Sequence, residues 1–276
     1  MDRALRWMSI LSLDAPLVAA AWLLAVGRPT PVELAALSLA VWWGYAVDRW
    51  LDGWKRGVVQ QGAARHRFAA QHRLGWGVFL GLVALVAFAL IPAQLPTRLV
   101  TAGLGLAIAL AVYIALDQLW PRALRAFAQR ELWVAAAVAA AVVLFAGWGV
   151  AGRADLTRSA PVAVALFALC AADCRAIRLL EGASLSKRGL AGPSGALFLC
   201  ALAAMAFAWS GALPQAGGAL AFGAFLAFAF EAGSSLTRCS ERLETAAPRC
   251  DLALASAGFC AALGSALLER LPLLAG

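Results

Sequence analysis

The chain is organised around the end of one apolar segment, which reads VWWGYAVDRWLDGWKR over residues 41–56. Two carboxylates in this stretch, Asp48 and Asp52, are four residues apart. At about 100° per residue, this spacing places them roughly 40° apart around a helix and about 6 Å apart along it, on one face. An ionisable group at the centre of a membrane span costs about 2.5–3.5 kcal/mol. The pair therefore marks a candidate functional site.

The composition is that of an integral membrane protein. Of 276 residues, 63% are hydrophobic and 14% are charged, whereas about 25% are charged in soluble domains. The net charge of +8 comes from basic residues in short segments between apolar runs, a pattern that argues against nucleic acid as a partner. The six cysteines show no metal-binding spacing, so we interpret them as small apolar residues.

Apolar runs of about 18 residues or more predict the transmembrane helices. They indicate an all-α, multi-pass bundle of about nine helices that forms a single domain over residues 1–276. The loop over 52–74 is expected to be basic and solvated. The predicted spans are 10–27, 33–51, 75–92, 98–118, 132–150, 160–180, 194–211, 216–234 and 251–268.

Lysine and arginine residues predict the orientation. Fifteen of the 23 lie on the side of the N-terminus, five lie on the other side and three lie inside spans. The positive-inside rule then makes the N-terminus cytoplasmic and puts the C-terminus on the opposite side of the cell inner membrane. In this topology the second and sixth spans both run towards the cytoplasm, and both carry acidic residues near that end.

The sixth span carries Asp173 and Glu181, eight residues apart. These two acids lie about 80° apart around a helix and about 12 Å apart along it, so they can face one cavity from two depths. Carboxylates on two facing helices suit Mg²⁺, which binds a few oxygen ligands together with substrate phosphates. Bound Mg²⁺ makes a diphosphate a better leaving group. The predicted metal ligands and catalytic residues are Asp48, Asp52, Asp173 and Glu181.

Basic and aromatic residues beside the two acidic helix ends complete the predicted site. The basic groups would contact a diphosphate, apolar surroundings would accept a lipid tail, and the rings of Trp42 and Tyr45 would face a cation. The predicted diphosphate contacts are Arg49, Lys55, Arg56, Arg65 and Arg67 near the second span and Arg178, Lys187 and Arg188 near the sixth.

Each of these signals also has a simpler structural explanation. Asp52 can pair with Arg56, and Glu181 with Arg178, within their own helices. Tryptophan is enriched at membrane interfaces whatever the function of the protein. No role is assigned to three further acids: Asp14, Asp117 and Glu231.

These features resemble the UbiA superfamily of intramembrane prenyltransferases. Its members have nine helices, a pocket that faces the cytoplasm, and aspartate-rich motifs on the second and sixth helices. The first family motif is Asn/Asp-x-x-x-Asp-x-x-x-Asp. In this chain Gly44, Asp48 and Asp52 match its last two positions and lack the first acid.

The second family motif is Asp-x-x-x-Asp with a further acid four residues on. Asp173, Ile177 and Glu181 keep its ends and have isoleucine in the middle. Three other stretches resemble a poorly characterised bacterial branch of the family. They are YxxDRxxD over 45–52, RHRF over 65–68 followed by HR at 72–73, and REL over 130–132.

The resemblance implies a Mg²⁺-dependent enzyme that ionises a prenyl diphosphate and transfers the prenyl group to a hydrophobic acceptor, aromatic or lipid-like. Each motif lacks one acid, which leaves two alternatives open. One is a non-catalytic membrane protein that binds an isoprenoid or a partner protein. The other is a small transporter or proton relay. The sequence does not determine the prenyl chain length, the acceptor or the oligomeric state.

Overall fold

The computed structural model describes residues 7–8, 10–54, 64–119 and 130–148, with seven more residues between 163 and 174. All regular structure in these ranges is helical, which confirms the all-α class for this part of the chain. The six α-helices are α2 (Asp14–Val26), α3 (Pro31–Asp52), α5 (Ala64–Gln71), α6 (Arg73–Leu90), α7 (Thr97–Leu119) and α9 (Arg130–Trp148), and the 3₁₀ turn η1 (Pro92–Gln94) follows α6.

Five of these helices match the first five predicted spans. α2, α3, α6, α7 and α9 begin and end within about four residues of the predicted limits, which is little more than the usual uncertainty of a helix end. Helical residues between 163 and 174 fall in the sixth predicted span. The three later spans, and with them the predicted side of the C-terminus, lie outside the described residues.

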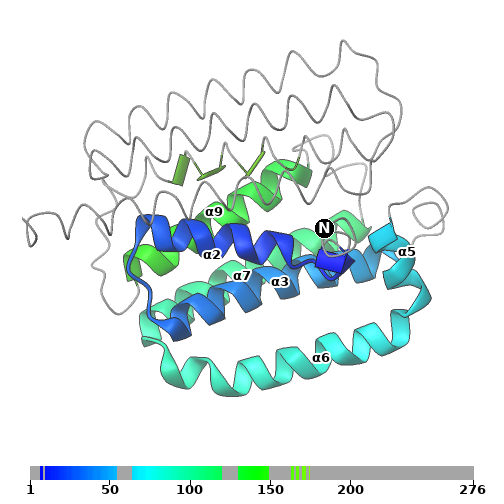
Figure 1. Cartoon of the computed structure of the whole chain (residues 1–276), viewed down its shortest axis with the longest axis horizontal. Coiled ribbons are helices and arrows are strands. Elements are labelled where there is room, and N and C mark those ends of the chain that lie inside the picture. The colour runs from blue at the N-terminus through cyan, green and yellow to red at the C-terminus, as the bar shows by residue number, and fades with distance from the viewer. Residues whose placement is uncertain are drawn as a thin grey trace, which may run out of the picture.

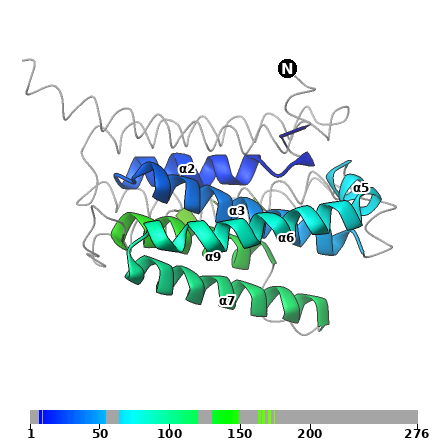
Figure 2. The same cartoon turned by 90° about the horizontal axis from the view of Figure 1, so that it is seen from below.

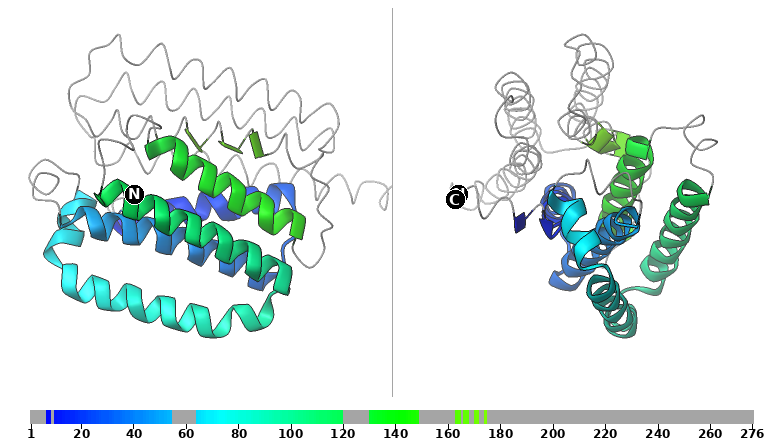
Figure 3. Two further views of the ribbon diagram at one scale, coloured as in Figure 1. Left: turned by 180° about the vertical axis from the view of Figure 1, so that it is seen from behind. Right: turned by 90° about the vertical axis from the view of Figure 1, so that its right-hand side faces the viewer.

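The helices run side by side and alternate in direction (Figure 1). α3 lies between α2 and α6, whereas α9 contacts α2 and α7, as the end-on view in Figure 3 shows. α5 crosses one end of this arrangement, which we call the α5 end (Figure 2). The starts of α2, α6 and α9 and the ends of α3 and α7 lie there. At the other end a Cβ on Gly27 would meet Ala146 of α9 at 3.3 Å.

A capping box fixes the start of α3. The hydroxyl of Thr30 accepts a hydrogen bond from the backbone N–H of Glu33 at 3.3 Å, and the Glu33 carboxylate accepts one from the backbone N–H of Thr30 at 2.7 Å. Pro31 occupies the first turn, where its missing N–H costs no helical hydrogen bond. The buried Glu33 carboxylate is thus hydrogen-bonded, and α3 begins at a defined residue.

Two segments are long and apolar enough to cross a membrane. They are Arg73–Gln94, which is α6 with η1, and Thr97–Leu119, which is α7. In the most apolar part of Arg73–Gln94 only 6% of the residues are buried, and in that of Thr97–Leu119 only 11% are. The core helix of a soluble protein, in contrast, is mostly buried. Leu74, Leu85 and Phe88 of α6 are at least 68% exposed. The outer sides of these helices therefore suit contact with lipid.

α5 is a helix within the loop predicted over residues 52–74. Its eight residues, ARHRFAAQ, include three alanines, and they pack against the end of α3. Ala69 is only 2% exposed, and a Cβ on Gly53 would lie 3.1 Å from the backbone N of Ala70. The loop is basic as predicted, but tertiary contact with α3 orders part of it as a helix.

Candidate functional site

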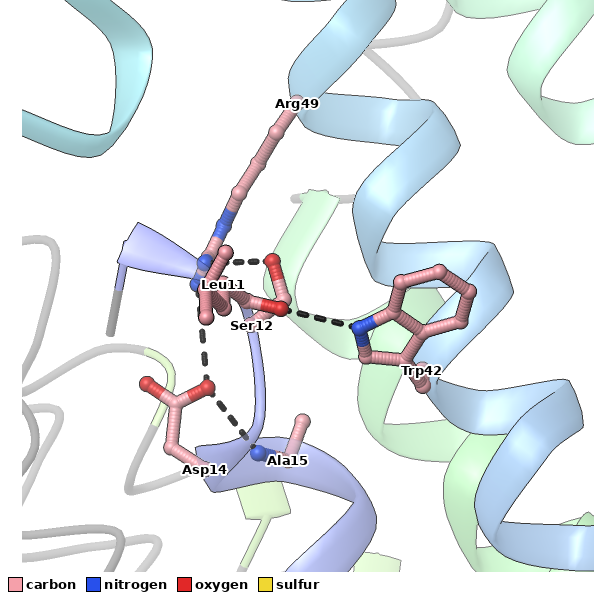
Figure 4. Close-up of polar contacts among 6 residues, drawn as sticks. All are labelled: Leu11, Ser12, Asp14, Ala15, Trp42 and Arg49. Carbon is pink, nitrogen blue, oxygen red and sulfur yellow. Dashed lines mark hydrogen bonds and ion pairs between the residues drawn. The ribbon is translucent and has the colours of Figure 1, made fainter. Parts of the chain in front are cut away.

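One face of α3 is bound to the segment that precedes α2. Trp42 and Arg49 are seven residues apart, so they point within about 20° of each other. The indole N–H of Trp42 donates to the Leu11 carbonyl at 2.8 Å, and Nη1 of Arg49 donates to the Ser12 hydroxyl at 2.6 Å (Figure 4). Two hydrogen bonds, from residues that are two helical turns apart, therefore define this face.

A second face of α3 is bound to α6, again by residues seven apart. The indole N–H of Trp43 donates to the Leu80 carbonyl at 3.0 Å, and that of Trp50 donates to the Arg73 carbonyl at 2.7 Å. Gly77 of α6 leaves room for the Trp50 ring, because a Cβ there would lie only 3.0–3.1 Å from ring atoms. The rotation of α3 about its axis is thus set from two directions.

These contacts fix the direction of the paired carboxylates. On a helix, Asp48 and Asp52 point about 140–180° away from the tryptophans that face α6. Gly44, one turn before Asp48, faces α7, since a Cβ there would lie 3.6 Å from Leu110. Asp52 is 5% exposed and Asp48 is half-buried. Both predicted acids therefore lie on the side of α3 opposite its contact with α6.

α5 brings basic residues to the same end of α3. Arg67 is exposed on α5, and Arg65 lies in the same helix. Gly53 makes this arrangement possible, because its missing side chain lets the α5 backbone approach the last turn of α3. Two of the predicted diphosphate contacts are thus carried by an element packed against the carboxylate-bearing helix. Two others, Lys55 and Arg56, lie outside the described residues.

The described part of the chain supplies two of the four predicted metal ligands. Within it no group of three or more His, Cys, Asp or Glu side chains could hold a metal ion. Asp48 and Asp52 remain suitable donors, because Mg²⁺ is commonly held by one or two carboxylates plus substrate phosphates and water. A metal site formed by all four acids stays a prediction, since the other predicted site residues lie outside the described ranges: Asp173, Arg178, Glu181, Lys187 and Arg188.

Residues just before Asp173 pack beside α9. Cys170 and Ala171 are buried against Ala135, in a cluster completed by Leu132, Val138 and Phe167. Cys170 is buried and Cys174 is partly buried. The apolar neighbours of Cys170 agree with the interpretation of this cysteine as a small apolar residue. The contact also places this part of the sixth span along the first half of α9, which starts at the α5 end.

The aromatic residues near the site are packed against one another. The Trp42 ring lies edge-on to Trp76 and Phe79 of α6, with centroids 6.3 and 6.0 Å away. Phe68 of α5 continues the cluster at 5.8 Å from Trp76. Trp42 thus has a clear packing role, and Tyr45 is partly buried on the same helix. Their predicted contact with a substrate cation stays a prediction.

The sequence reasoning missed a buried polar cluster made of Ser12, Asp14 and Arg49. Their exposed fractions are 1%, 2% and 8%. Nη2 of Arg49 lies 4.0 Å from Oδ1 of Asp14, and the same oxygen accepts a hydrogen bond from the backbone N–H of Ala15 at 3.0 Å (Figure 4). Two residues in the sequence could have indicated this cluster: Asp14, an acid in the first apolar run, and Arg49, an arginine in the second.

Comparison with known proteins adds no family to this description. The chain matches no protein-family model. It also matches no curated protein and no solved structure. The resemblance to the UbiA superfamily therefore stays a prediction that depends on the motifs around Asp48 and Asp173 and on the predicted topology.

Proposed function

We propose that this protein is a UbiA-like, membrane-embedded prenyltransferase of the cell inner membrane. In this proposal it uses Mg²⁺ to bind a prenyl diphosphate and transfers the prenyl group to a hydrophobic acceptor. The N-terminus and the α5 end face the cytoplasm. The proposal is supported by the paired acids of α3, the basic helix beside them, and two apolar helices with exposed outer sides.

One observation carries the proposal furthest. Asp48 and Asp52 share the single face of the last turns of α3 that is directed away from α6, and Asp52 is 95% buried on that face. Mg²⁺ is commonly held by one or two carboxylates together with substrate phosphates. Two carboxylates that leave one helix on the same side, next to the basic helix α5, match that donor set.

The chemistry that follows is a substitution at an allylic carbon. Bound Mg²⁺ would neutralise the charge that develops on the diphosphate. The bond between the allylic carbon and the diphosphate oxygen breaks, and its electron pair leaves with the diphosphate. An electron pair of the acceptor then forms the new carbon–carbon or carbon–oxygen bond, and the acceptor gives up a proton to water or to the released diphosphate. Asp48 and Asp52 would hold the metal, while Arg67 and its basic neighbours would bind the leaving diphosphate.

Binding of geranylgeranyl diphosphate to the purified protein in detergent tests the proposal. We expect binding with Mg²⁺ present and its loss on addition of EDTA. Asp48→Asn and Asp52→Asn should each weaken binding by about 10-fold or more, because loss of one ligand leaves the metal with too few anionic oxygens.

Glu33→Gln is the matched control for these two variants. It removes a buried carboxylate from the same helix, yet glutamine keeps the capping box. This variant should bind as the wild type does. Binding that is indifferent to Mg²⁺ and to both aspartates, or no binding at all, would refute the proposed function.

A second candidate is binding of the isoprenoid without turnover. Two observations favour it. Gly44 stands where the first family motif has an acid, so a metal ligand is missing one turn before Asp48. Arg49 is bonded to Ser12 and not directed at the site of the diphosphate. Assays for pyrophosphate release with aromatic and lipid-like acceptors distinguish the two candidates. Mg²⁺-dependent binding without pyrophosphate release for any acceptor would favour the second.

A further inference from the structure

We infer that Arg49 is a positioning residue, which fixes the orientation of the two carboxylates, and that it does so through Ser12 and Asp14. This inference rests on the proposed function, because it concerns the metal site that the proposed function assigns to α3. It differs from the sequence-based prediction, in which Arg49 contacts the diphosphate directly. Figure 4 shows the cluster on which it depends.

The direction of the Arg49 side chain is the first argument. On the helix Arg49 lies about 100° from Asp48 and about 60° from Asp52, so all three leave α3 within two turns but point differently. Its Nη1 donates to the Ser12 hydroxyl at 2.6 Å, and its Nη2 lies 4.0 Å from Asp14. The guanidinium therefore binds the segment before α2, beside the face that carries the acids.

The backbone at Ser12 supports the same role. Ser12 has a φ of 60°, the only positive value for a non-glycine residue among those described. Serine in this left-handed region is disfavoured, so the surrounding contacts must hold it there. The bond from Arg49 to the Ser12 hydroxyl is one such contact, and the bond from Trp42 to the Leu11 carbonyl is another. A strained turn is thus held against α3 at two points.

Burial makes the cluster a strong constraint on the end of α3. Asp14 is 2% exposed, and its Oδ2 has no hydrogen-bond partner within the described part of the chain. Arg49 is the one cationic residue that is buried among the described residues. Loss of its guanidinium would remove the positive charge that the described residues place beside the buried Asp14 carboxylate. The ion pair therefore resists any rotation of α3 that separates Arg49 from Asp14.

Three sides of the last turn of α3 are then held by different elements. Arg49 holds the side towards α2, Trp50 holds the side towards α6, and Gly53 lies against α5. The remaining side carries Asp48 and Asp52. Groups that orient metal ligands without touching the metal commonly change metal affinity or activity by about 10–100-fold when they are removed.

Steady-state kinetics on four variants test the inference: Arg49→Met, Arg49→Lys, Asp14→Asn and Ser12→Ala. We expect Arg49→Met and Asp14→Asn each to lower kcat or to raise the half-saturating Mg²⁺ concentration by about 10-fold. The KM for the prenyl diphosphate should change by less than about threefold, because neither residue touches it. Arg49→Lys should recover part of the loss, since it keeps a charge near Asp14. Arg98→Met, at the opposite end of the bundle, should have no effect.

Direct contact with the diphosphate predicts a different pattern. In that case Arg49→Met raises the KM for the prenyl diphosphate by 10-fold or more, while Asp14→Asn and Ser12→Ala have little effect. This result would overturn the inference and leave the proposed function intact. Absence of turnover and of Mg²⁺-dependent binding in the wild type would instead refute the proposed function, and the inference with it.

Thermal unfolding of the wild type, Asp14→Asn, Arg49→Met and the double variant gives a readout independent of activity. Each single variant should lower the melting temperature. We expect the decrease in the double variant to be much smaller than the sum of the two single decreases, because the second change removes the charge left unpaired by the first. Additive effects would show that the two residues are not coupled and would overturn the inference.

Discussion

Gly77 of α6 offers a sharp test of the packing that orients α3. A Cβ at this position would lie 3.0 Å from Cζ2 of the Trp50 ring and 3.1 Å from both Cε2 and Nε1. The ring cannot move away freely, because its N–H is bonded to the Arg73 carbonyl at 2.7 Å. Gly77→Ala should therefore push the Trp50 ring out of its position against α6.

The expected magnitude follows from two opposing effects. Overpacking of a well-packed contact costs about 1–3 kcal/mol, whereas alanine in place of glycine within a helix contributes about 1 kcal/mol of stability. Gly75 and Gly81 of the same helix are matched controls, since a Cβ at either meets no atom of the described residues within 4 Å. Gly77→Ala should thus be less stable than Gly75→Ala by about 1–3 kcal/mol, or roughly 2–6 °C in melting temperature.

Thermal unfolding in detergent, followed by circular dichroism at 222 nm, measures this difference. Trp50→Phe should rescue Gly77→Ala, because phenylalanine lacks the part of the indole that meets the new methyl group. Equal melting temperatures for Gly77→Ala and Gly75→Ala would refute the reasoning. They would show that the ring of Trp50 does not occupy the space above Gly77.

Two further predictions concern α3. Gly44→Asp should lower the half-saturating Mg²⁺ concentration by about threefold or more, because it adds a third carboxylate one turn before Asp48. The position has room for a side chain, since the nearest atom to a Cβ there is 3.6 Å away. Gly44→Ala should leave the half-saturating Mg²⁺ concentration unchanged. Thr30→Ala should cost about 1 kcal/mol of stability through loss of the capping box, whereas Thr30→Ser should cost little because it keeps the acceptor. Melting temperatures that do not separate these Thr30 variants would contradict the second prediction.

The existence and the limits of α2, α3, α6, α7 and α9 follow from local sequence. Their apolar runs are long, their ends carry proline, glycine or polar residues, and each boundary lies close to its predicted place. The carboxylate pair on α3 is equally local, because the four-residue spacing of Asp48 and Asp52 puts both on one face of any helix. Composition and periodicity are sufficient for such features, since they depend on neighbours along the chain.

Contacts between helices required the folded chain. Arg49 adjoins Asp48, so the sequence suggests that it shares the site, yet its guanidinium pairs with Asp14, 35 residues earlier. α5 is helical because its alanine-rich side lies against Gly53, a contact that no periodicity in residues 52–74 reveals. The side chains of Arg49 and Trp50 are long, so the helix that each one reaches depends on where that helix packs. The position of a residue along α3 determines the direction in which its side chain points. Packing between helices determines which residue it meets there.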